Sequence, residues 1–197
     1  PQAALSFDFT QNGELVKSYN LTKDMGSKPV FGVYAPAVLK LNAQNAFAVE
    51  RINISGSAGI NGTECDMTGG KKCCKDIANL KTPGIYIVKA EVIGQNGDSY
   101  THSFSFNVFA PFIFDVKAKA KSDAEINKQV IKGKAPLVVN FAVRVPNANG
   151  EPEWFKNGKK FNPDTDNVFN ADAKVECRVK GLDGRVYTKS FEVKIVA

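Results

Sequence analysis

The chain has 197 residues, of which 43% are hydrophobic and 23% are charged, so it is long enough for one large or two small globular domains. It contains no apolar run of the roughly 18 residues that a membrane-spanning helix needs, and we expect no membrane span. The formal net charge of +6 is uneven, because residues 1–110 hold 10 basic and 9 acidic residues and residues 111–197 hold the remaining 16 and 11.

In the first half, alternating apolar and polar residues predict β-strands. The strand after Ala35-Pro36 presents Leu39, Leu41 and Ala43 on one side. A later hairpin turns at residues 95–98, where an Asn-Gly pair supplies the positive φ angles of a tight turn. Its inward residues are predicted to be Tyr86, Val88, Ala90 and Val92, then Phe104, Phe106 and Val108, with Ser103, Ser105 and Asn107 facing out.

The second half shows the same pattern. Residues 153–158 predict a central strand whose Trp154, the only Trp, anchors the core. The one short helix candidate spans residues 122–130. The predicted inward residues are Val139, Phe141 and Val143 after Ala135-Pro136, then Val175, Cys177 and Val179, and finally Phe191, Val193 and Ile195. We expect Tyr86 and Phe104 to anchor the first core, and Trp154 and Phe191 the second.

The two halves are copies of one module. Residues 84–108 align without a gap on residues 171–195 at an offset of 87, and Ala35-Pro36 aligns on Ala135-Pro136 at an offset of 100. Further upstream, Phe7 aligns on Phe114 at an offset of 107. We therefore expect two domains, residues 1–110 and 111–197, joined by a short apolar junction that is stiff rather than flexible.

Short strands with turn signals every 8–12 residues predict a β-sandwich in each module. The segment Gly133-Lys-Ala-Pro-Leu-Val-Val-Asn-Phe141 resembles the opening of polycystic kidney disease (PKD) domains, and Pro83–Val88 resembles their closing hairpin. The central Trp-Asp-Phe-Gly-Asp-Gly motif of that family is absent. The resemblance implies an all-β chain of two tandem immunoglobulin-like (PKD-like) sandwiches, a fold that the family uses for non-catalytic spacers or binding modules on secreted and surface proteins.

Three of the four cysteines, Cys65, Cys73 and Cys74, fall in residues 63–75, which we interpret as a loop inserted into the first module. A turn there would bring Cys65 near Cys73 or Cys74, and we expect a disulfide. A zinc site usually has two pairs of closely spaced Cys or His ligands, and the chain has no such pair of pairs; free thiols are the other alternative. Cys177 is interpreted as a buried free thiol in the second core.

The even number of cysteines in a small all-β chain favours an oxidising compartment, and we expect an extracellular, cell-surface or periplasmic location. The sequons begin at Asn20, Asn53 and Asn61, all in the first module.

No catalytic or cofactor motif is present, so we expect a non-enzyme without cofactors. His102 shares the parity of inward Phe104 and reads as a core-edge residue rather than part of a triad. Residues 162–167 read as a polar turn rather than a calcium loop. The lysines of residues 117–121, with Lys128, Lys132 and Lys134, lack interleaved aromatic or Arg side chains, which excludes nucleic acid and favours an edge strand protected from aggregation.

The sequence therefore predicts a structural or adhesive protein, in the form of a subunit of a surface filament or assembly, with protein partners or self-association. A carbohydrate- or protein-binding module is the alternative, with Tyr19, Tyr34 and Phe47 as candidate exposed aromatics against competing core roles. A two-domain pilus-type chaperone is a weaker alternative, because it rests on size and basicity alone.

Overall fold

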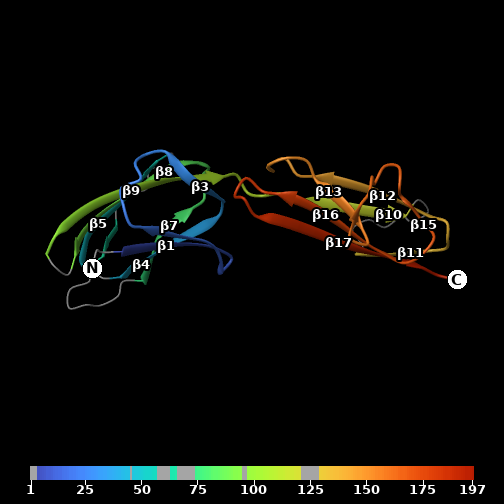
Figure 1. The fold of residues 1–197 in the computed structure, drawn as a ribbon, viewed down its shortest axis with the longest axis horizontal. Coiled ribbons are helices and arrows are strands. Elements are labelled where there is room, and N and C mark those ends of the chain that lie inside the picture. The colour runs from blue at the N-terminus through green and yellow to red at the C-terminus, as the bar shows by residue number, and fades with distance from the viewer. Residues whose placement is uncertain (1–3, 45, 57–62, 66–73, 95–96, 121–128) are drawn as a thin grey trace. The chain divides into compact units, whose positions relative to one another are not determined.

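Figure 1 shows the computed structural model of the chain, which describes all residues except 1–3, 45, 57–62, 66–73, 95–96 and 121–128. The chain divides into two compact units, Pro1–Pro111 and Phe112–Ala197. Each unit has its own cluster of buried apolar residues. The described residues of both units form strands, turns and bends, with no helix among them.

The first unit is a sandwich of two sheets. Its strands are β1 (Ala4–Gln11), β2 (Glu14–Leu21), β3 (Pro29–Tyr34), β4 (Ala37–Gln44), β5 (Ala46–Gly56), β6 (Thr63–Cys65), β7 (Cys74–Leu80), β8 (Gly84–Gly94) and β9 (Ser99–Phe109). One sheet has the order β2-β1-β4-β7 and the other β3-β9-β8-β5-β6. Every pairing is antiparallel except that of β3 with β9, which is parallel.

The second unit repeats this arrangement. Its strands are β10 (Asp115–Ala120), β11 (Val130–Gly133), β12 (Leu137–Arg144), β13 (Glu153–Lys156), β14 (Lys159–Lys160), β15 (Val168–Phe169), β16 (Ala173–Lys180) and β17 (Val186–Ile195). The sheets have the orders β10-β12-β15 and β11-β17-β16-β13-β14, with β11 parallel to β17. Ala35-Pro36 and Ala135-Pro136 are both cis. The strand order confirms the predicted fold class, two tandem immunoglobulin-like sandwiches.

The pairing register corrects one part of the predicted duplication, the alignment of Phe7 with Phe114. Phe7 lies opposite Leu41 on β4, and the counterpart of Leu41 at an offset of 100 is Phe141. The residue opposite Phe141 is Ala118, so β1 and β10 correspond at an offset of 118 − 7 = 111 instead of 107. A shift of four residues keeps every side chain on the same face of a strand, so the alternation pattern could not distinguish the two alignments.

Aromatic residues from both sheets fill the two cores. In the first unit, the ring centroids of Phe7 on β1 and Phe104 on β9 are 5.0 Å apart, and Phe104 and Tyr86 are fully buried. In the second, Phe141 on β12 lies 5.2 Å from Trp154 on β13. Trp154 is 8% exposed and Phe191 is 5% exposed. Each sandwich therefore closes by aromatic packing between its sheets, beyond the burial of the aliphatic residues.

Tyr86 forms a tyrosine corner in the first unit. It lies near the start of β8, and its hydroxyl donates a hydrogen bond of 2.7 Å to the carbonyl oxygen of Thr82. Immunoglobulin-like sandwiches use this contact to fix the connection that crosses from one sheet to the other. Burial raises the pKa of the Tyr86 phenol, so the hydroxyl stays a donor at neutral pH. The counterpart of Tyr86 at an offset of 87 is Ala173, so the second unit lacks the corner at this position.

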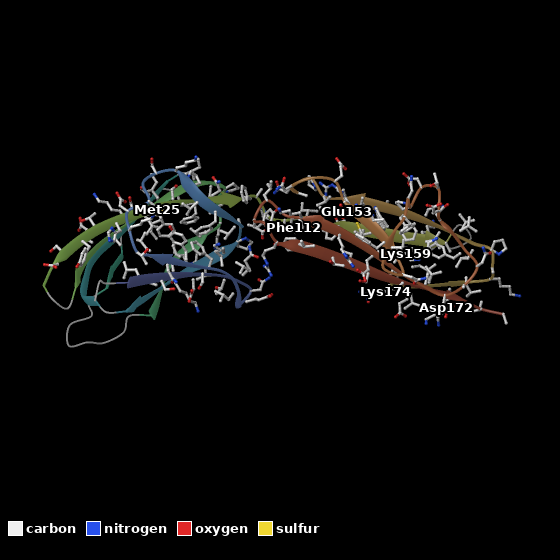
Figure 2. The ribbon with its side chains drawn as sticks, viewed as in Figure 1. Met25, Phe112, Glu153, Lys159, Asp172 and Lys174 are labelled. Atoms are coloured by element: carbon white, nitrogen blue, oxygen red, sulfur yellow. The ribbon has the colours of Figure 1, made fainter. Side chains whose placement is uncertain are left out.

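The prediction that Ser105 faces solvent is wrong. Ser105 is fully buried, and its hydroxyl donates to the carbonyl oxygen of Tyr86 at 2.7 Å. Its side chain is small enough to lie against the backbone of β8. Neighbouring Ser103 is half-buried because Asp24, in the loop between β2 and β3, accepts hydrogen bonds from its backbone N–H and its hydroxyl. The next loop residue, Met25, donates its N–H to the carbonyl of Ser103 at 2.7 Å (Figure 2).

Candidate functional site

The outer sheet face of the second unit gathers paired charges around one aromatic ring. Because β16 turns Val175, Cys177 and Val179 into the core, Lys174, Glu176 and Arg178 project from the opposite face. The register places Arg178 opposite Glu153, and Phe155 opposite both Glu176 and Lys160. We call Glu153, Phe155, Lys160, Lys174, Glu176 and Arg178 the outer face; Glu153 and Lys174 are labelled in Figure 2.

Glu176 is the centre of this group. The Nη2 and Nε atoms of Arg178 donate to its Oε2 atom at 2.7 and 3.0 Å. The Nζ atom of Lys174 lies 3.2 Å from its Oε1 atom. The hydrogen bonds from Arg178 and, second, Lys174 hold the pKa of Glu176 below its ordinary value. The carboxylate is therefore ionised at neutral pH and pairs with both cations.

Arg178 also covers the one aromatic residue of the outer face. Its guanidinium carbon lies 4.2 Å from the centroid of the Phe155 ring, within cation–π range. Beside it, the Nζ atom of Lys160 lies 3.2 Å from Glu153 Oε1. A shallow hollow of about 520 Å³ adjoins this pair and is lined by Asn149, Gly150, Glu151, Glu153, Phe155, Arg178, Val179, Lys180 and Val186. Val186 is 66% exposed and adds an apolar rim to the hollow.

Arg and aromatic side chains are enriched where proteins contact one another. An Arg held by a carboxylate and resting on a ring has already lost most of its rotamer freedom, so it loses little more on binding. The arrangement suits recognition of a protein surface. It offers no nucleophile next to a base, and within the described part of the chain no group of three or more His, Cys, Asp or Glu side chains could hold a metal ion.

The predicted disulfide falls largely outside the described residues. Cys73 lies outside the described residues, and the side chains of Cys65 and Cys74 are not described. Their backbones place Cys65 at the end of β6, opposite Val49, and Cys74 at the start of β7, opposite Asn42. These are the edge strands of the two different sheets of the first unit. The disulfide and the inserted loop at residues 63–75 stay predictions.

Of the three sequons, only the one at Asn20 has its asparagine side chain among the described residues. Asn20 lies exposed on the edge strand β2. Asn53 lies on β5 and its side chain is not described, and Asn61 is outside the described residues. Glycosylation stays a prediction at all three.

Cys177 is a free, fully buried thiol, as the pattern of β16 indicated. It lies opposite Trp154 on β13 and Lys189 on β17. Burial raises the pKa of the thiol to about 12, which leaves it protonated and unreactive at neutral pH.

The remaining predicted positions are structural. His102 lies opposite Ala90 and stacks on Tyr100 with ring centroids 6.0 Å apart. Both of its ring nitrogens are buried and have no hydrogen-bond partner among the described residues. The turn at residues 162–167 is closed by Asn162, whose carbonyl accepts the N–H of Asp166 at 2.8 Å and whose side chain accepts the N–H of Asp164 at 2.9 Å.

The lysine-rich segment forms an edge strand where it is described. Strand β10 is at the edge of its sheet, with Ala118 and Ala120 buried and Lys117 exposed. Lys132 and Lys134 are exposed, whereas Lys121, Lys128 and most of the predicted helix lie outside the described residues. Val130, at the end of that predicted helix, begins strand β11 instead.

The aromatic residues considered for carbohydrate do not form an exposed row. Tyr34 is 1% exposed and its ring packs 5.7 Å from Phe109. Tyr19 is half-buried, with its ring 4.6 Å from Phe104. The side chain of Phe47 is not described. Tyr34 and Tyr19 therefore belong to the core of the first unit, because the loops and strands around them cover their rings.

Reasoning from the sequence missed the outer face. The alternation of β16 implied that Lys174, Glu176 and Arg178 share a side, but the positions of Phe155 and Glu153 opposite them depend on the register of β13. That register comes from tertiary pairing across a long connection and leaves no mark in the local pattern.

Comparison with solved structures found three similar proteins. The fibronectin(III)-like modules of CbhA from Clostridium thermocellum are similar over 87% of this chain and 92% of theirs, at 11% identity and a TM-score of 0.38. Murine CEACAM1b is similar over 85% and 96%, at 12% identity and a TM-score of 0.36. The insect immune protein hemolin is similar over 89% of this chain and 45% of its own, at 19% identity and a TM-score of 0.32.

No family model matches the chain, and no curated protein does. The strand order of the two units supports the immunoglobulin-like assignment, and membership of the PKD family stays a prediction. The described part of the chain contains no helix that is long and apolar enough to cross a membrane.

Proposed function

We propose that this chain is a non-enzymatic structural or adhesive protein that acts outside the cell or in the periplasm and associates with further copies of itself. The observation that carries the proposal is the outer face of the second unit, where Arg178 is held on Phe155 by Glu176. The association would bury this ring and its guanidinium at the centre of a contact, the position where interfaces concentrate their binding energy.

A second copy of the chain is the partner that the charges favour. The outer face alternates in sign, with the carboxylates Glu153 and Glu176 lying between the cations Lys160, Arg178 and Lys174. A surface of mixed sign can face its own copy across a two-fold axis with opposite charges in register. The apolar side chain of Val186 at the rim would be covered in the same contact.

The proposed location rests on the first unit. Asn20 in its sequon is exposed on an edge strand, where a glycan would fit without displacing the core. A glycan on β2 would also keep that edge from pairing with other strands, which is a common protection of exposed edges. Mass spectrometry of the protein from its own cells tests this part, because an unmodified Asn20 and reduced cysteines would contradict an oxidising compartment with glycosylation.

The assembly state of the protein released from its producing cells tests the function itself. Electron microscopy is expected to show paired copies, which should be lost in a chain carrying Arg178→Glu and retained in one carrying Lys134→Glu, an exposed residue that is not part of the outer face. Uniform monomers for the unmodified chain would contradict the proposal. Imaging with and without reductant separates a role of the cysteines from that of the outer face.

A further inference from the structure

The second unit has an open cleft at one end of its sandwich, distinct from the outer face. Its volume is about 680 Å³, within the range of small-molecule sites. It is lined by Phe112, Ile113, Phe114, Asp115, Arg144, Tyr187, Thr188 and Lys189. The lining comes from three places in the second unit: the segment that leads into β10, the end of β12 and the start of β17. The lining therefore combines residues of both sheets of the second unit.

One wall of the cleft is aromatic. The ring centroids of Phe112 and Tyr187 are 4.2 Å apart, and those of Phe112 and Phe114 are 6.0 Å apart. Phe114 also packs on the buried core of the unit. The hydroxyl of Tyr187 donates to Asp183 at 2.6 Å, which fixes the ring. The wall is thus an apolar surface that is formed before any ligand arrives (Phe112 is labelled in Figure 2).

The lining of the cleft also carries cations. Lys189 shares the core-facing side of β17 with Phe191 and Val193, so a charge stands where the core pattern would place an apolar residue. Arg144 ends β12 and lies opposite Asp115 on β10. A second hollow of about 380 Å³ shares Phe114, Asp115 and Lys189 and adds Lys117. The cleft therefore offers two cations on its lining and one carboxylate.

The internal duplication shows that these charges belong to the second unit alone. Tyr187 corresponds to Tyr100 in the first unit, so this ring is retained. By the same registers, Lys189 corresponds to His102, Arg144 to Gln44 and Asp115 to Ala4. The aromatic position is common to both copies of the fold, whereas the arginine, lysine and aspartate are not required by it.

We infer that the cleft binds an acidic saccharide, with the carboxylate of a uronic acid between Arg144 and Lys189 and the sugar ring against the aromatic wall. Arginine and lysine recognise carboxylates by charge-assisted hydrogen bonds. Asp115 and Thr188 supply acceptors for sugar hydroxyl groups. Asp115 also disfavours a densely charged polyanion, because its carboxylate would repel closely spaced sulfates or phosphates. The inference is independent of association through the outer face.

The test is a titration of the full chain with methyl glucuronide and methyl glucoside, which differ by a carboxylate in place of a hydroxymethyl group. Amide and side-chain NMR signals report the binding. We expect glucuronide to shift signals of the cleft residues and to bind about tenfold or more tightly than glucoside. Arg144→Gln and Lys189→Gln should each weaken glucuronide binding several-fold, and Lys134→Gln, at an exposed position outside the cleft, should not.

Several outcomes would overturn the inference. Equal binding of glucoside and glucuronide would remove the role of the cations, and unchanged binding in both cleft variants would place the ligand elsewhere. Acetate binding as well as glucuronide would show a carboxylate site without recognition of the ring. Tighter binding of a tripeptide with a free C-terminus would make the cleft a peptide site. Each variant is at an exposed position, and its amide spectrum shows directly whether it is folded.

Discussion

Two buried side chains show how single residues act in this fold. Tyr86 ties the start of β8 to the turn before it, and Cys177 fills a core position of β16 whose counterpart in the first unit is Ala90. Both were identified as inward from the alternation of their strands. The hydrogen bond of Tyr86 was not predicted, because its acceptor is a backbone carbonyl whose position depends on the turn, and no residue type marks it.

Removing the Tyr86 hydroxyl should destabilise the first unit. Tyr86→Phe keeps the ring but leaves the Thr82 carbonyl without this donor, so we expect the free energy of unfolding to fall by about 1–2 kcal/mol. Hydrogen exchange of the β8 amides measures it within the full chain. Tyr100→Phe, a half-buried control in the same unit, should change it by much less. Equal effects of the two substitutions would show that the corner bond adds no stability.

Cys177 should resist alkylation in the folded protein. The thiol is fully buried and its pKa is raised to about 12, so almost no thiolate is accessible at neutral or mildly alkaline pH. Peptide mapping after iodoacetamide treatment is expected to find Cys177 unmodified in buffer and fully modified in guanidinium chloride. Rapid modification in buffer would mean that β16 opens frequently or that the core is packed differently.

At the scale of elements, alternation predicted which face of most strands is buried, and the turns and the paired Ala-Pro segments predicted where strands end. Alternation failed where a four-residue shift leaves the buried face unchanged, and where a tertiary contact determines whether a side chain is buried. The offset of β1 against β10 and the burial of Ser105 are the two cases. The outer face belongs to the same class, since it is made by the pairing of β13 with β16 rather than by either strand alone.

The ion pairs of β16 should make the stability of the second unit depend on pH. The folded-state pKa of Glu176 is lowered, so the carboxylate stabilises the fold above its unfolded pKa, and that contribution is lost as the pH falls through the folded pKa. Glu176→Gln should cost up to about 1 kcal/mol at neutral pH, the range of surface pairs. Denaturant unfolding at pH 7 and at about pH 3 measures the difference, which should be smaller at the acidic pH.

The control for this measurement is Glu151→Gln, an exposed carboxylate in the connection between β12 and β13. It should leave the stability at both pH values nearly unchanged. A Glu176→Gln variant that is as stable as the unmodified chain at neutral pH would show that Arg178 and Lys174 hold the carboxylate without stabilising the fold.

At the scale of the whole molecule, the chain is a duplicated sandwich whose copies have diverged in their surfaces. The second unit has its own buried core, built from Ala118 and Ile131 through Val139 and Trp154 to Val193, and it holds +5 of the net charge of +6. Composition predicted that asymmetry of charge. Which of the charged residues line the cleft and which lie on the outer face follows only from the three-dimensional arrangement.

The second unit should fold without the first. Residues 112–197 have a complete set of two sheets and a core to which every strand but the short β14 contributes buried or packed side chains. Expressed alone, this fragment is expected to unfold in one cooperative transition and to give dispersed amide signals. A fragment that stays unfolded would contradict the division of the chain into two domains.

Sedimentation velocity of the full chain over a range of concentrations tests self-association through the outer face most directly. The unmodified chain should show a concentration-dependent shift to larger species, Arg178→Glu should weaken the association by about tenfold or more, and Lys134→Glu should leave it unchanged. A chain that remains monomeric at every concentration, or an association that Arg178→Glu does not alter, would contradict the account.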